Sequence, residues 1–310
     1  MFAYIRNRLL LAIPTVLGVT TFVFLTLHLI PGDPVTVMVD GPVSAEQAQL
    51  IRDHLGLDDP LHVQYGRFLL DVLRGDLGRS LRTNRPVMQD ILEHLPNTIQ
   101  LSVAAMFLAV VLGVVMGIIA AVWHNTWIDT LSIVVSLIGV SMPIFWLGLI
   151  LIFIFAMRLN WFPATGQGGL NRLILPAITL AWFAGATIAR LVRSSMLDVL
   201  NAGYITTARA KGLSEQFVVF RHALRNALIP VITIIGLQFG SLLVGTVITE
   251  TVFARRGLGR LIVTSILEKD FPLVQGAVLF TALTYIAVNL LVDISYAFID
   301  PRIHYGSYES

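Results

Sequence analysis

Six long apolar runs constrain the fold of this chain more than any other feature of its sequence. They occupy residues 9–30, 101–123, 131–157, 173–189, 227–249 and 274–299. A transmembrane helix needs about 20 predominantly apolar residues. Only 13% of the chain is charged, which is about half the share that is usual in a soluble domain. The sequence therefore predicts an all-α integral membrane protein with six transmembrane helices.

The first run has the basic flank of a secretory signal peptide, because Arg6 and Arg8 precede it. It spans 22 residues, however, and no small-x-small cleavage pattern follows it. The apolar region of a signal peptide is shorter than this run. We expect a first transmembrane helix that is retained.

The distribution of Lys and Arg predicts the orientation of the chain. The loop 31–98 is too long to count, because long loops are translocated largely regardless of their charge. If the N-terminus is cytoplasmic, the cytoplasmic segments, the N-terminus included, hold nine Lys and Arg residues, and the outer loops other than 31–98 hold six. Cytoplasmic loops carry the excess of positive charge, so we expect both termini and the segment 204–230 in the cytoplasm.

The long loop after the first span has the signals of a helical cap on the extracytoplasmic side. Ser44 and Gln47 form a capping box at the start of one short helix. A second amphipathic pattern follows Pro60 and stops at Gly75, and Pro86 opens a third. Short amphipathic helices need partners for their apolar faces, so we expect these three to pack on one another and on the outer ends of the spans.

These patterns divide the chain into four parts. Residues 1–30 form the N-terminus and first span, and residues 31–98 form the extracytoplasmic cap. Residues 99–300 form the membrane domain with spans two to six and with a cytoplasmic loop at 194–227. Residues 301–310 form a cytoplasmic tail.

Motifs for metal, nucleotide and nucleophile chemistry are absent from the sequence. There is no cysteine, and the seven histidines include no H-x-x-x-H pair, so no zinc site is expected. The two lysines, Lys211 and Lys269, lie outside any phosphate-binding G-x-x-x-x-G-K-[ST] loop, and no G-x-S-x-G nucleophile elbow occurs. We expect a chain that is not an enzyme and has no cofactor or metal of its own.

A few polar residues in or beside the spans are candidates for a solute pathway. Gln238 and Ser241 lie three residues apart on span five, and Asp33 and Glu250 follow spans one and five at the outer mouth. Three of them have a structural alternative: the Gln238 amide and the Ser241 hydroxyl can bond a neighbouring helix, and Asp33 is a typical turn residue. Asp293 is an acid within span six, where a structural partner is the favoured interpretation.

The most unusual segment lies between spans four and five, where basic residues interrupt the apolar chain. Its pattern predicts a helix over 204–211 that Gly212 ends, and a second helix that begins at Ser214 and leads to a span opened by Pro230. The apolar face expected for the second helix consists of Phe217, Phe220, Leu224 and Leu228.

The first of these two helices is narrow and basic, since it carries alanines together with Arg209 and Lys211. A narrow basic helix suits a groove on another protein. Equally, it suits an interfacial helix that anionic lipids hold through its basic side chains. The residues by themselves do not separate these two functions.

Several motifs in order resemble the permease subunits of ABC-type peptide importers, the branch that carries dipeptides, oligopeptides, glutathione and nickel. They are Pro31-Gly32-Asp33-Pro34, Gly75-Asp76-Leu77-Gly78, Thr207-Ala208-Arg209-Ala210-Lys211-Gly212-Leu213-Ser214, His222-Ala223-Leu224-Arg225-Asn226-Ala227-Leu228-Ile229-Pro230, Gly257-Leu258-Gly259-Arg260 and Asp300-Pro301-Arg302. The broader permease signature begins with Glu-Ala-Ala, whereas this chain has Thr206 or Thr207 at the position of the acid.

The resemblance implies that the helix 204–215 is a coupling helix, which docks on a cytoplasmic ATPase. The implied coupling residues are Thr207, Ala208, Arg209, Ala210, Lys211, Gly212, Leu213 and Ser214. The implied partners are a second homologous permease, two ABC ATPase subunits that hold ATP and Mg, an extracytoplasmic substrate-binding protein and the lipid bilayer of a bacterial inner membrane. No nucleic acid is expected.

By the same resemblance, the chain forms half of the translocation pathway of an importer for short peptides or peptide-like solutes, with glutathione and a nickel chelate as alternatives. A stand-alone secondary transporter is the rival from another class. It needs intramembrane ion ligands and usually internal repeats, but Asp293 is the only acid within a predicted span and no repeat is evident.

Overall fold

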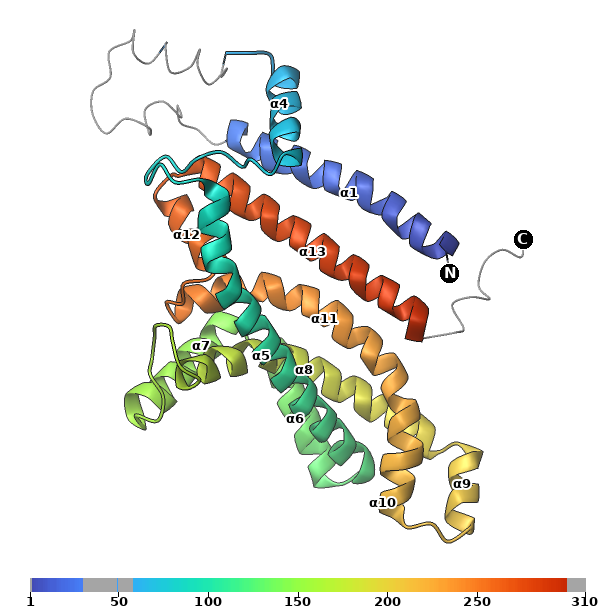
Figure 1. The fold of residues 1–310 in the computed structure, drawn as a ribbon. Coiled ribbons are helices and arrows are strands. Elements are labelled where there is room, and N and C mark those ends of the chain that lie inside the picture. Colours follow the sequence, from blue (N-terminus) through green and yellow to red (C-terminus); the bar gives the residue numbers. More distant parts are fainter. Residues whose placement is uncertain (1, 30–48, 50–57, 300–310) are drawn as a thin grey trace. The chain divides into compact units, whose positions relative to one another are not determined.

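A computed structural model describes residues 2–29, 49 and 58–299 (Figure 1). Helices dominate this part of the chain, and one isolated antiparallel bridge joins Arg79 to Pro86. Asp33, the predicted capping box at Ser44 and the predicted tail lie outside the described residues.

The chain forms two compact units. The first comprises residues Met1–Asn97 and Arg256–Leu290, and the second comprises Thr98–Arg255 and Leu291–Ser310. Each unit is described by itself below.

In the first unit, helix α1 (Phe2–Leu29) contacts the short helix α4 (Leu61–Leu73). The Tyr65 hydroxyl of α4 lies 2.8 Å from the Thr21 hydroxyl of α1, and its ring meets Phe24 edge-on at a centroid distance of 5.2 Å. Helix α4 begins directly after Pro60, and Gly75 follows its end with a φ of +77°. The prediction of this short helix is confirmed.

The core of the first unit joins the start of α5 (Val87–Val122) to helices α12 (Leu258–Leu267) and α13 (Phe271–Ile299). The side chains buried together are Val87 and Ile91 of α5, Leu258 and Ile262 of α12, and Leu273 and Ala277 of α13. Asp270, between α12 and α13, accepts hydrogen bonds from the Ser80 hydroxyl at 2.5 Å and from the Leu81 backbone N–H at 3.1 Å. These bonds fasten the loop before α5 to the start of α13.

The predicted third cap helix does not exist as a separate element. Its residues form the first turns of α5, which continues for 36 residues and contains Pro96. A proline removes one hydrogen bond from the helix interior, but buried residues recur at helical spacing on both sides of it, with Ile91 before Pro96 and Thr98 and Leu101 after it.

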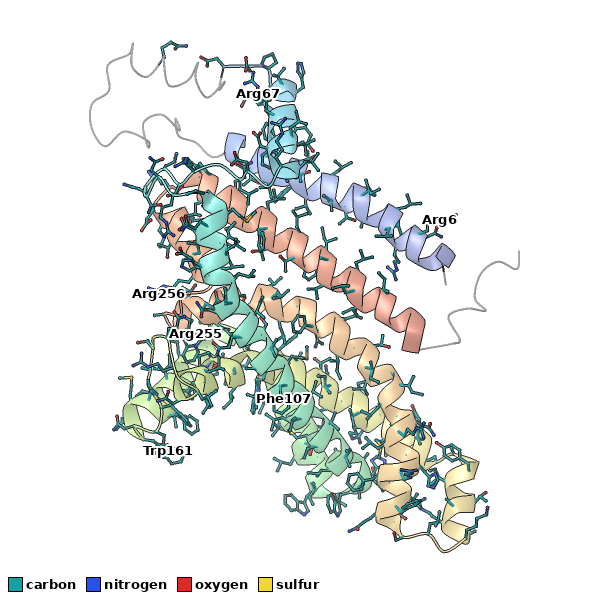
Figure 2. The ribbon with its side chains drawn as sticks, viewed as in Figure 1. Arg6, Arg67, Phe107, Trp161, Arg255 and Arg256 are labelled. Carbon is teal, nitrogen blue, oxygen red and sulfur yellow. The ribbon has the colours of Figure 1, made fainter. Side chains whose placement is uncertain are left out.

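The second unit is built around α8 (Asn171–Leu200), whose buried face carries mostly small and aliphatic residues. Helix α5 approaches it closely at two glycines: a Cβ added to Gly113 would lie 2.8 Å from the Ile188 Cβ, and one added to Gly117 would lie 2.6 Å from the Val192 Cβ. Small residues at these positions allow the helix backbones to come together. Other parts of this unit are exposed: the side chains of Phe107, on α5, and of Trp161 face outward (Figure 2).

Five helices in the described residues are long and apolar enough to cross a membrane: Arg6–Thr26, Val87–Val122, Asn171–Leu200, Glu215–Val252 and Phe271–Val292. The predicted third span is not a straight helix. It consists of α6 (Trp127–Ser141) and, after a bend of 110°, α7 (Ile144–Leu151) with the π-helix η1 (Ile152–Arg158). If this bent pair is one span, the described residues contain six.

Candidate functional site

The predicted coupling residues lie on a short helix that follows α8 almost directly. Helix α9 (Gly203–Ala210) begins after a linker of Asn201 and Ala202. Its residues Ile205 and Ala208, three positions apart, are buried on one face. Of the eight predicted coupling residues, Ala208 alone is buried, and the other seven are exposed. The helix therefore packs on its own protein along one narrow side and presents the rest of its surface outward.

A left-handed turn ends this helix where the sequence predicts it. Gly212 has a φ of +78°, and its N–H donates to the Arg209 carbonyl at 2.9 Å. The Leu213 N–H donates to the Ala208 carbonyl at 3.4 Å. A Cβ added at Gly212 would meet nothing within 4 Å. Glycine is therefore required here by the backbone conformation and not by close packing within this chain.

An ion pair closes this turn. Arg209 donates from Nε to Glu215 Oε2 at 3.1 Å and from a terminal guanidinium nitrogen to Oε1 at 2.6 Å. This bidentate hydrogen bonding raises the pKa of Arg209, although both side chains are exposed. Ser214 precedes the next helix, as predicted, but its hydroxyl makes no capping hydrogen bond.

The chain that follows the turn differs from the sequence prediction in register. Helix α10 (Glu215–Phe217) runs through the π-helix η2 (Val218–Ala223) into α11 (Leu224–Val252), and Pro230 lies inside α11 instead of opening it. The predicted continuous face is also wrong, because Phe217 and Phe220 are 46% and 61% exposed.

The face that is buried instead consists of Val218, Val219, Ala223 and Ala227. A π-helical turn contains more residues than an α-helical one, so it shifts which side chains face the core. Leu224 and Leu228 do pack against that core as partly buried residues.

The exposed surface around the turn is therefore mixed. Tyr204, Leu213, Phe217 and Phe220 contribute apolar area beside Arg209. Tyr204 is also held in place, since its hydroxyl accepts a hydrogen bond of 2.8 Å from the Asn226 side chain of α11. We name residues 203–217 the coupling segment, after the role that the sequence predicts for them.

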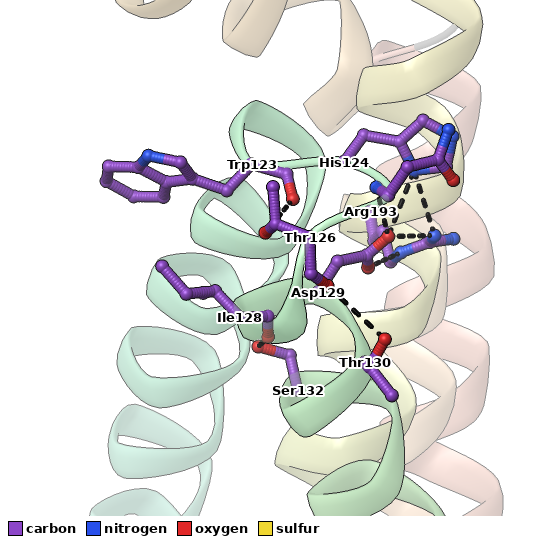
Figure 3. Close-up of polar contacts among 9 residues, drawn as sticks. Trp123, His124, Thr126, Ile128, Asp129, Thr130, Ser132 and Arg193 are labelled. Atoms are coloured by element: carbon purple, nitrogen blue, oxygen red, sulfur yellow. Dashed lines mark hydrogen bonds and ion pairs between the residues drawn. The ribbon is translucent and has the colours of Figure 1, made fainter.

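A second polar cluster lies on the same unit and was missed by the sequence reasoning (Figure 3). Asp129, in the first turn of α6, is only 3% exposed. Arg193 of α8 donates from Nε to Asp129 Oδ1 at 2.6 Å and from a terminal nitrogen to Oδ2 at 2.8 Å. The Asn125 N–H donates to Oδ2 at 3.0 Å, and His124 Nδ1 lies 3.0 Å from the same oxygen.

The signal for this cluster was present in the sequence, but it was not specific. Asp129 lies two residues before the predicted third span, and Arg193 lies four residues after the predicted fourth. With the predicted orientation these two ends lie on the same side of the membrane. That places the residues at the same depth without showing that they meet.

The residues predicted for the outer mouth differ in their surroundings. Glu250 is fully buried, and it accepts a hydrogen bond of 2.7 Å from the Thr98 hydroxyl. Gln238 is half-buried and Ser241 is exposed on α11. Asp33 lies outside the described residues. Glu250 is therefore packed inside the chain. Its predicted contact with the solute stays a prediction.

Among the described residues, no three His, Asp or Glu side chains gather in a way that could hold a metal ion.

Comparison with known proteins gives two matches to family models. Residues 113–305 match the binding-protein-dependent transport system inner membrane component, and residues 1–102 match the N-terminal region of such membrane components.

The relatives found are similar over their whole length. The chain is 46% identical to the glutathione transport system permease protein GsiC of Salmonella paratyphi A, with 98% of this chain and 100% of that protein covered. It is 43% identical to the dipeptide transport system permease protein DppB of Alkalihalophilus pseudofirmus, with the same coverage.

Solved structures show the fold at lower identity. A chain of the inward-facing MetNI methionine ABC transporter matches with a TM-score of 0.60 at 17% identity, covering 69% of this chain and 97% of that one. A chain of an amino acid ABC transporter matches with a TM-score of 0.53 at 16% identity, covering 69% and 94%. The helical arrangement resembles that of chains in ABC transporters.

Proposed function

Because the chain belongs to the family of binding-protein-dependent transport system inner membrane components, we propose that it imports short peptides or peptide-like solutes. It is a multi-pass transmembrane permease subunit of an ABC importer. The observation that carries the substrate class is the sequence identity of 43% to a dipeptide permease and of 46% to a glutathione permease, over the full length of each. Glutathione is itself a short peptide, so it lies within the same proposal.

In this proposal the chain forms half of a translocation pathway in a bacterial inner membrane, and a second homologous permease forms the other half. Two cytoplasmic ATPase subunits hold ATP and Mg, and an extracytoplasmic binding protein delivers the solute. The chain itself holds no cofactor, and both of its termini are cytoplasmic.

The coupling segment is the docking element for the ATPase in this proposal. Its support is geometric: a left-handed turn at Gly212 presents exposed residues, and the segment joins α8 through only two linker residues. Because α8 is the most extensively packed helix of its unit, a displacement of the segment reaches the membrane helices over a short path. Closure of the ATPase pair would then switch the pathway between inward and outward openings.

Purification from the native membrane tests the assembly. The chain should bring with it two ATPase subunits or domains, a second permease and, when the solute is present, a binding protein. Mass spectrometry of the small molecule held by that binding protein identifies the substrate. A short peptide supports the proposal, whereas a nickel chelate would contradict it. Purification of the chain alone, with uptake driven by an ion gradient, would favour a secondary transporter instead.

The orientation is tested by labelling, because the chain has no cysteine of its own. A cysteine that replaces Leu73, an exposed residue at the end of α4, should react with an impermeant thiol reagent in intact cells. A cysteine that replaces Ser214 should react only after the membrane is opened. The opposite labelling pattern would reverse the proposed topology.

A further inference from the structure

Two charged side chains connect α8, which leads into the coupling segment, to α6, which is the first helix of the bent pair. Arg193 lies about two helical turns before the end of α8, at about 3.6 residues per turn, and the coupling segment follows that end at once. Asp129 lies in the first turn of α6. The two residues are 64 positions apart in the sequence.

The contact between them is directional. The planar guanidinium of Arg193 meets both carboxylate oxygens of Asp129, at 2.6 and 2.8 Å. Such a fork fixes the angle between the two groups as well as their separation. The Asn125 N–H holds the same carboxylate from the turn before α6, so the carboxylate is fixed from both helices' sides.

A second contact holds α6 to α8 nearer the bend. A Cβ added to Gly139 of α6 would lie 2.8 Å from Trp182 Nε1 and 2.9 Å from the Ala186 Cβ, both on α8. Helix α6 is therefore fixed to α8 at its first turn by the ion pair and near its last turn by close packing. Two separated contacts of this kind prevent α6 from rotating about either one.

Helix α6 stops at the bend itself. After Ser141 the chain turns by 110° into α7, with Pro143 as the residue before that helix. Pro143 has no N–H to donate to the Gly139 carbonyl four residues earlier. The helical hydrogen bonding is interrupted there, so the bend can change its angle without breaking either helix.

We propose that Arg193 and Asp129 are positioning residues that make α6 move together with α8 when the coupling segment is displaced. The angle of the bend between α6 and α7 then changes. The inference rests on the proposed function, because it assigns these residues a part in the same coupling. The competing explanation is that Arg193 only neutralises a buried carboxylate. Both explanations predict that loss of Arg193 alone destabilises the subunit, but only the first requires the pair for coupling.

A double variant separates the two explanations. Replacing a buried ion pair by apolar residues of similar size is often neutral for stability. Asp129→Leu with Arg193→Met should therefore keep the folded subunit while it removes the fork. Reconstituted with all partner subunits, this variant should still hydrolyse ATP but import at least about tenfold fewer solute molecules per ATP, within the usual range of coupling between sites.

Two further variants control this measurement. Arg193→Lys keeps the charge without the bidentate fork, so its ratio of import to hydrolysis should fall between those of the double variant and the unmodified chain. Glu93→Gln removes an exposed ion pair with Arg85 in the other unit and should leave the ratio unchanged. A double variant that folds and couples normally would overturn the proposal.

A distance measurement tests the rigid connection directly. Spin labels on cysteines that replace Leu131 of α6 and Arg190 of α8, both exposed, should report one distance with and without bound ATP. In the double variant the distance should broaden or change between the two states. A change of this distance in the otherwise unmodified chain would overturn the inference. Loss of ATP-driven uptake in the unmodified chain would instead contradict the proposed function itself.

Discussion

Two ion pairs in the second unit use the same chemistry in opposite surroundings. Arg209 and Glu215 close the turn of the coupling segment with 42% and 56% of their side chains exposed. Arg193 and Asp129 join α8 to α6 with 22% and 5% exposed. Both arginines bind their carboxylate in a bidentate manner.

The difference in exposure decides what each pair contributes. An exposed pair is screened by water, and it contributes about 0 to 1 kcal/mol to stability. A buried carboxylate that loses its partner is left as an uncompensated charge, which costs about 3 to 5 kcal/mol. The turn pair therefore orders a surface that a partner can contact, whereas the α6–α8 pair holds two helices of the same chain together.

The largest expected effect comes from breaking the buried pair on one side only. Arg193→Met leaves the Asp129 carboxylate without its main partner and should lower the free energy of unfolding by about 2 to 3 kcal/mol. This is less than for a completely buried pair, because Arg193 is partly exposed. Thermal unfolding in detergent and the abundance in the membrane measure the loss. If the single variant were as stable as the Asp129→Leu, Arg193→Met double variant, the buried carboxylate would not need Arg193.

A smaller effect on stability, with a large effect on coupling, is expected at the turn. A β-branched residue at Gly212 would have to adopt a φ of +78°, which costs about 1 to 2 kcal/mol. The strain is local, since no atom lies within 4 Å of the added Cβ. Gly212→Val should therefore lower ATP-driven uptake while the subunit remains in the membrane.

Two glycine controls sharpen that test. Gly212→Asn should be tolerated better, because asparagine adopts the left-handed conformation more readily. Gly203→Ala should have little effect, since Gly203 has open space around it and no positive φ. Normal uptake by Gly212→Val at normal abundance would remove the turn from the coupling mechanism.

The smallest effect on stability is expected for the exposed pair. Glu215→Gln should change the free energy of unfolding by less than about 1 kcal/mol, and the subunit should remain at normal abundance.

Uptake measured for Arg209→Gln and Arg209→Lys tests whether the exposed surface of the coupling segment contacts a protein or a lipid. If any basic residue restores uptake and Gly212→Val has no effect, anionic lipid is the partner of this segment. If Glu215→Gln destabilised the subunit as much as Arg193→Met does, the two ion pairs would not differ in their contribution to stability.

Local signals in the sequence determined a large part of this molecule. Long apolar runs predicted membrane helices, Pro60 and Gly75 marked the limits of α4, and Gly212 marked the end of α9. These features depend on hydropathy over about 20 residues or on the conformational preference of a single residue. Both can be read directly from the chain, as can the motifs that resemble a known family.

Tertiary structure decided the features that depend on packing between distant residues. Pro96 and Pro230 lie inside helices because the surrounding helix compensates for one missing hydrogen bond. Because of the π-helical turn η2, Val218 and Val219 face the core, whereas Phe217 and Phe220 are exposed.

The polar environments show the same dependence on distant residues. The burial of Glu250 against Thr98 and the pairing of Asp129 with Arg193 join residues 152 and 64 positions apart. A sequence places such residues at similar depths in a membrane, but it does not state which of them touch, because contact depends on how each helix is rotated about its axis. Side-chain packing sets that rotation, and packing exists only in the folded chain.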